Sequence, residues 1–199
     1  MDNMYLIGDS IRCGSVKSPG YECFVREKLK GSCNVYSPDE NCRFAQYTLR
    51  GLCDWVNQVD VAEIDLVHWN NGLWDVLRLN GDEPLTPLDC YVYMLERVYK
   101  KIRLFFPNAK IIFAATTPVI EKNSPPGWER RNAEIEKYND EAKKLMNKLG
   151  VKVNDLYSAA KQFDESYYAD WTHFNEKGAI ILADEIIKNY KNYRKDVNS

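Results

Sequence analysis

The sequence lacks the features that mark several common classes of binding protein. Its 199 residues include only two histidines, and no Cys-x-x-Cys pair accompanies them, so no zinc site of ordinary spacing is predicted. No apolar run approaches the ~20 residues of a membrane span. The formal net charge is -2, without a basic excess. We therefore expect no metal, no membrane and no nucleic acid as partners.

A secretory pattern is also missing. The first residues carry no basic segment followed by a long apolar stretch, so no signal peptide is predicted. Six cysteines could pair in a secreted protein, but a chain of 199 residues has enough core to fold without them. We expect reduced, mostly buried thiols and a cytoplasmic protein. The six are Cys13, Cys23, Cys33, Cys42, Cys53 and Cys90.

What the sequence does contain is an alternation of strand and helix patterns. Apolar residues are 45% of the chain and charged residues 28%, as in ordinary globular proteins. Strands are predicted at residues 5–8, 34–36, 64–69, 110–116 and 151–154. Helices are predicted at residues 21–30, 43–58, 88–106, 128–150 and 175–190. This alternation predicts one three-layer α/β domain over residues 1–199, with a five-stranded parallel sheet.

Polar segments follow several of the predicted strands. The first is Gly8-Asp9-Ser10, and the others are residues 39–43, 68–75 and 170–173, the last just before the final helix. Gly, Asp, Ser and Asn are ordinary turn formers. Ligands of open parallel sheets, however, bind beyond the carboxyl ends of the strands, so Ser10 is a candidate nucleophile.

A catalytic serine needs a base within hydrogen-bond reach and a carboxylate that orients the base. His68 lies inside an apolar run and is interpreted as a buried strand residue. His173 lies in a polar segment, three residues after Asp170. On one loop, that carboxylate can approach Nδ1 of the imidazole while Nε2 faces Ser10.

Two other patterns fit the first turn less well. The α/β-hydrolase elbow requires G-x-S-x-G, but Arg12 occupies the position of the second glycine. A nucleotide-binding loop would need GxGxxG or GxxxxGK[ST] after the strand, and neither is present.

Four blocks along the chain resemble the SGNH, or GDSL, hydrolase family. Gly8-Asp9-Ser10 with Gly14 is similar to block I, and residues 170–178 (DWTHFNEKG) are similar to block V. Thr116-Thr117-Pro118-Val119 also resembles members of this family. The resemblance implies a flavodoxin-like α/β/α fold and an ester-hydrolysing serine enzyme without metal or cofactor. Its catalytic residues would be Ser10, Asp170 and His173.

The resemblance also implies an oxyanion hole. Its expected donors are the N–H of Ser10, the N–H of Cys42 and the side-chain amide of Asn71. Two of them depart from the family pattern. In residues 40–43 (ENCR), which most resemble block II, Cys42 replaces a glycine, and residues 69–72 (WNNG) replace the usual G-x-N-D of block III. Asn70 remains an alternative to Asn71.

Aromatic and charged residues near these blocks suggest the substrate. Tryptophans suit the apolar faces of sugars, and arginines could hold an anionic group, although both are often structural. The residues expected to contact substrate are Asp9, Arg12, Arg43, Trp69, Asn70 and Trp171. A small-molecule or carbohydrate ester, with acetyl as the acyl group, is the favoured substrate. The alternatives are a lysophospholipase or short-chain acyl esterase, and a non-catalytic binding module on the same fold.

Overall fold

A computed structural model describes residues 1–197. Five parallel strands form the central sheet in the order β2-β1-β3-β5-β7, which confirms the predicted fold class. The strands are β1 (Asp2–Ile7), β2 (Cys33–Tyr36), β3 (Leu66–Trp69), β5 (Lys110–Ala114) and β7 (Lys152–Asn154). The last two residues of the expected domain, 198 and 199, lie outside the described residues.

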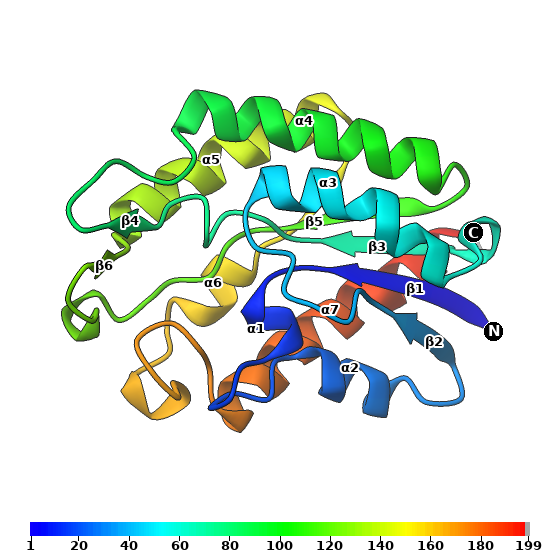
Figure 1. The fold of residues 1–199 in the computed structure, drawn as a ribbon. Helices are drawn as coiled ribbons and strands as arrows, with labels where there is room; N and C mark the ends of the chain where they lie inside the picture. The colour runs from blue at the N-terminus through cyan, green and yellow to red at the C-terminus, as the bar shows by residue number, and fades with distance from the viewer. Residues whose placement is uncertain (198–199) are drawn as a thin grey trace.

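Helices cover both faces of this sheet. One face carries α3 (Ala45–Trp55), α4 (Leu88–Phe105) and α5 (Asn132–Lys148), which pack against one another in that order (Figure 1). The other face carries α1 (Ser10–Cys13), α2 (Glu22–Lys28), α6 (Leu156–Ala160) and α7 (Glu176–Val197). Short 3-10 turns are η1 (Val56–Gln58), η2 (Val61–Glu63), η3 (Glu121–Asn123) and η4 (Glu165–Tyr167).

The register of the inner strands aligns their carboxyl ends. Ile7 of β1 lies opposite Trp69 of β3, which lies opposite Phe113 of β5. All three side chains are buried, as expected for a parallel sheet covered on both faces. The segments that follow these strands therefore leave the sheet side by side, at one edge.

One expected helix begins later than predicted. Helix α5 starts at Asn132 rather than at residue 128, because Trp128–Glu129 forms β6, which pairs antiparallel with β4 (Arg78–Leu79). Its other end agrees with the prediction, since Gly150 has φ +69°, a conformation that favours glycine after a helix. The short elements α1 and α6 were not predicted.

The cysteines differ from expectation in their burial. All six are free in residues 1–197, but only Cys33 and Cys42 are buried, while Cys23, Cys53 and Cys90 are exposed. Thiols at helix surfaces leave no hydrophobic pattern in the sequence, which explains the error.

No helix in the described chain is long and apolar enough to cross a membrane.

Candidate active site

Ser10 is the first residue of α1, directly beyond the end of β1. Asp9 caps this helix, because its Oδ1 accepts a hydrogen bond of 2.9 Å from the N–H of Ile11. The cap leaves the Asp9 side chain only 1% exposed, so it is not the accessible substrate contact that was expected. Burial raises the pKa of Asp9, against the opposing effects of the Ile11 N–H and Arg130.

The structure brings Ser10, His173 and Asp170 together from opposite ends of the chain. Nε2 of His173 lies 2.8 Å from Oγ of Ser10, and Nδ1 lies 2.7 Å from Oδ2 of Asp170. Burial acts to raise the pKa of Asp170, but hydrogen bonds from the N–H groups of His173 and Thr172 and from the imidazole hold it below its ordinary value. The carboxylate therefore remains ionised and able to support a positive imidazolium.

Hydrogen bonds hold the loop that carries Asp170 and His173. The carbonyl of His173 accepts from the N–H of Ala169 at 2.8 Å. The carbonyl of Phe174 accepts from Oγ of Ser18 at 2.6 Å, which ties the loop to the segment after α1. The ring of Phe174 is buried beneath the loop. The histidine is thus held toward Ser10 by contacts on both sides.

The expected oxyanion donor at Cys42 is not available. Its N–H donates to the carbonyl of Gly8 at 3.1 Å, so this group joins block II to the end of β1. A left-handed backbone conformation, which favours glycine, occurs one residue later, at Arg43, which has φ +49°. The N–H of Arg43 is also occupied, by Oδ1 of Asn41 at 2.8 Å.

The structure favours Asn70 over Asn71 as the side-chain donor to the oxyanion, which is the opposite of the expectation. Both hydrogens of the fully buried Asn71 amide are used, by the carbonyl of Arg43 at 3.0 Å and by Oγ1 of Thr48 at 2.8 Å. Asn70 donates once from its side chain, to the carbonyl of Ala114 at 2.8 Å, and keeps a second hydrogen. Asn70 also lines a small internal cavity with Asp9. Asn70 is therefore the better candidate for the oxyanion hole.

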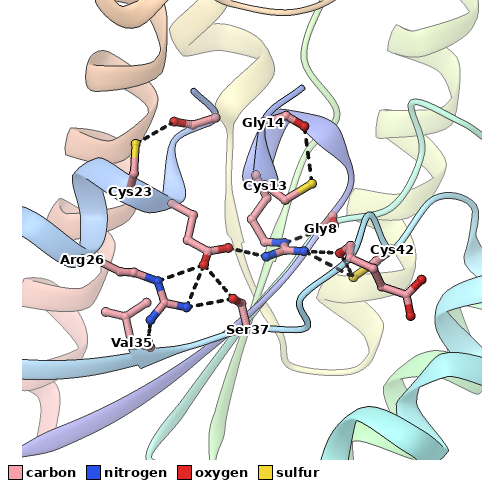
Figure 2. Close-up of polar contacts among 12 residues, drawn as sticks. Gly8, Cys13, Gly14, Cys23, Arg26, Val35, Ser37 and Cys42 are labelled. Atoms are coloured by element: carbon pink, nitrogen blue, oxygen red, sulfur yellow. Dashed lines mark hydrogen bonds and ion pairs between the residues drawn. The ribbon is translucent and has the colours of Figure 1, made fainter. Parts of the chain in front are cut away.

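Arg12 is a structural residue rather than a substrate contact. Its guanidinium is 1% exposed and pairs with the carboxylate of Glu22. The same side chain donates to the carbonyls of Gly8 and Glu40, as Figure 2 shows beside the labelled Gly8 and Cys42. Arg12 thus holds the block II loop against the end of β1.

Two more expected substrate contacts have partners within the protein. Trp69 is fully buried, and its Nε1 donates to Oδ1 of Asn71 at 2.7 Å. Arg43 is exposed, but its guanidinium lies 4.8 Å from the centre of the Tyr47 ring. Trp69 belongs to β3, and strand residues alternate between the two faces of a sheet, so its closeness in sequence to block III did not place its side chain at the site.

A surface groove of about 560 Å³ borders Asp170 and Trp171. Its lining residues include the aromatic Tyr168 and Trp171 and the polar Lys17, Asn123 and Glu165. Among the expected substrate residues, Trp171 is the one that lines this groove. The groove thus combines aromatic and hydrogen-bonding residues beside Asp170, while Ser10 and His173 are not among its lining residues.

The sequence pattern does not point to Arg130 as a residue of the site. It is 4% exposed and lies among the loops that carry Asp9, Leu73 and Thr172. In the sequence, it stands beside Arg131 at the start of a charged helix pattern, which is typical of a solvated residue. Its side chain points inward just after the short strand β6, and no pattern in the sequence predicts that strand.

Comparison with known proteins identifies the family. The sequence model of the GDSL-like lipase/acylhydrolase family matches residues 6–180. The chain belongs to this family. Within it, the chain is 27% identical over 119 residues to a GDSL esterase/lipase of Arabidopsis thaliana, CPRD49, and that match spans 55% of this chain and 46% of the plant protein. This esterase/lipase family is the one that the motif blocks of the sequence resemble.

Solved structures support the GDSL fold over nearly the whole chain. A lipase/acylhydrolase from Enterococcus faecalis superposes with a TM-score of 0.78 at 20% identity, covering 97% of each chain. A carbohydrate esterase family 3 from Talaromyces cellulolyticus gives a TM-score of 0.74 at 19% identity, covering 98% of this chain and 99% of the other. At this level of identity, these likenesses establish the fold.

Proposed function

We propose that this GDSL hydrolase removes small acyl groups, acetyl above all, from the hydroxyls of carbohydrates. The observation that carries the proposal is the continuous hydrogen-bonded series from Ser10 Oγ through His173 to Asp170. A nucleophile, a base and an orienting carboxylate in this order are the requirements of acyl transfer through serine.

The first half-reaction forms an acyl-enzyme. Oγ of Ser10 bonds to the ester carbonyl carbon while Nε2 of His173 takes its proton, and the carbonyl oxygen becomes an oxyanion. Among the described residues, the N–H of Ser10 has no acceptor in the protein, so it can bind this oxyanion, with the free hydrogen of Asn70 as the second donor. The carbon–oxygen bond to the alcohol then breaks, and His173 returns the proton to the alcohol oxygen.

The second half-reaction releases the acid. Water bonds to the acyl carbon while His173 accepts its proton, and the second tetrahedral intermediate uses the same donors. The bond to Oγ then breaks, and the proton returns from His173 to Ser10. Asp170 stays ionised throughout, consistent with its lowered pKa.

The groove beside Asp170 supports a carbohydrate as the alcohol. The rings of Tyr168 and Trp171 can cover the apolar faces of a sugar, while Lys17, Asn123 and Glu165 can bond its hydroxyls. A volume of about 560 Å³ is within the usual range for small-ligand sites. The carbohydrate esterase among the similar structures is in keeping with this choice.

The proposal is tested by an ester panel and a covalent probe. p-Nitrophenyl esters of rising chain length should be hydrolysed fastest at acetyl, and acetylated xylo-oligosaccharides should release acetate. A fluorophosphonate should label the wild type at Ser10 and leave Ser10→Ala unlabelled. Faster hydrolysis of octanoyl than of acetyl esters would contradict the acetyl preference, and an unlabelled, inactive wild type would contradict the enzyme itself.

A further inference from the structure

Arg130 joins two loops of the candidate active site through one side chain. Its Nε donates to the carbonyl of Leu73 at 2.5 Å, in the loop after β3 that begins with Asn70. Its Nη1 donates to Oγ1 of Thr172 at 3.3 Å, and its guanidinium lies 4.9 Å from the centre of the Trp171 ring. Trp171 and Thr172 are the two residues between Asp170 and His173.

The charge of Arg130 is held without a direct ion pair. Within the described chain, no carboxylate oxygen lies within 4.0 Å of its nitrogens. Burial lowers the pKa of Arg130 to about 10, and the nearby carboxylates of Asp9 and Asp170 act in the opposite direction. These two aspartates flank Ser10 and His173. A buried guanidinium is costly unless its surroundings compensate it, and here the compensating charges belong to the candidate active site.

The loop that Arg130 contacts has little regular structure of its own. Between η4, which ends at Tyr167, and α7, which begins at Glu176, there is only an isolated bridge from Tyr168 to Phe174. The direction of the His173 imidazole therefore depends on individual backbone hydrogen bonds and side-chain contacts of this loop, including those to Arg130. Arg130 supplies a planar surface for Trp171 and a donor for Thr172, which a lysine could not combine.

We propose that Arg130 is a positioning residue that holds the Asp170–His173 loop in register with Ser10, an inference that rests on the proposed esterase function. It acts through Trp171 and Thr172 rather than by touching substrate. Small displacements of a catalytic group can lower a rate by ~10². Loss of the guanidinium should therefore reduce kcat by roughly 10- to 100-fold with little change in KM.

The test compares Arg130→Met with Arg131→Met on p-nitrophenyl acetate. Arg131 is a matched control because it is the next residue, is exposed, and pairs with Glu129 at 2.6 Å. Arg130→Met should lose kcat and Arg131→Met should not. Arg130→Lys should recover only part of the loss. In Arg130→Ala, millimolar guanidinium ion should restore part of kcat, and lithium or sodium chloride at equal ionic strength should not.

A second pair of variants covers the case in which Arg130→Met does not fold. Thr172→Val removes the hydroxyl that accepts from Arg130, and Thr172→Ser keeps it, so kcat should fall further in the valine variant. Wild-type kcat in folded Arg130→Met, or an equal kcat in the two Thr172 variants, would overturn the positioning role while leaving the esterase proposal intact. A wild type without ester hydrolysis or fluorophosphonate labelling would instead refute the proposed function.

Discussion

Asn70 and Asn71 follow one another in the chain, but their side-chain amides bond to different parts of the fold. Asn70 donates to the carbonyl of Ala114 at the end of β5, whereas Asn71 donates to Thr48 in α3. Asn71 also accepts from the indole of Trp69, and its carbonyl accepts from Tyr91. One asparagine therefore belongs to the edge of the sheet where Ser10 lies, and the other fastens the sheet to its helices.

This difference predicts opposite effects for the two alanine variants. Asn70→Ala should lower kcat by ~10² with little change in KM, because it removes a donor to the oxyanion. Asn71→Ala should mainly destabilise the fold, by about 1–3 kcal/mol, because it leaves buried partners unsatisfied. Steady-state kinetics and urea unfolding measure the two effects. A larger loss of kcat per folded molecule in Asn71→Ala would contradict the assignment.

The two histidines should differ in the same way. Removal of the base in His173→Ala should lower kcat by at least ~10³. His68 contacts Asn154 through Nε2 at 3.2 Å, and burial lowers its pKa to about 4, so it is a neutral residue of the sheet. His68→Gln should keep kcat per folded molecule within about tenfold, or ~1.4 kcal/mol. Comparable losses in both variants, measured on p-nitrophenyl acetate, would refute this distinction.

The place of Ser10 could be expected from the sequence, because the apolar runs located the strands and the segments after parallel strands leave the sheet at one edge. His173 follows α6 and η4 rather than a strand, and it was expected near Ser10 because it lies three residues after Asp170 and because His68 lies inside an apolar run. The sequence could not show which of the adjacent asparagines donates to the oxyanion. Both carry the same amide group, and their different surroundings depend on how α3 and β5 pack in the fold. Arg12 was misjudged for a similar reason, because its partner Glu22 is brought to it by the fold of the loop between α1 and α2.

Asp75 should make the stability of the fold depend on pH. It is fully buried, its Oδ1 accepts from the N–H of Ala45 at 3.1 Å, and its Oδ2 has no partner within residues 1–197. Burial raises the pKa of Asp75 to about 7. Between its unfolded pKa of about 4 and this value, the unfolded chain releases a proton that the folded protein retains. Rising pH therefore favours unfolding through this group.

Asp75→Asn removes this ionisation and isolates its effect. As the pH rises from 5 to 8, the wild type should lose the stability that the protonated Asp75 contributes, and the variant has no such contribution to lose. The free energy of unfolding of the variant minus that of the wild type should therefore rise by about 3 kcal/mol, at 1.36 kcal/mol for each pKa unit. Urea unfolding at the two pH values measures the change, and the comparison cancels the other titrating groups. A difference between the two proteins that is the same at both pH values would contradict the raised pKa.

Arg43 should be the one site in block II where glycine is more stable than alanine. Its φ of +49° lies in the left-handed region, which costs a residue with a Cβ about 1 kcal/mol or more relative to glycine. The conformation aims the Arg43 carbonyl at the amide of Asn71, 3.0 Å away.

Arg43→Ala and Arg43→Gly both lose the contact with the Tyr47 ring, so their difference reports the backbone alone. Arg43→Gly should exceed Arg43→Ala by about 1 kcal/mol in urea unfolding, although glycine is normally the less stable of the two. Equal or reversed stabilities would show that this loop relaxes to a negative φ, and Asn71 would then lose an acceptor for its amide.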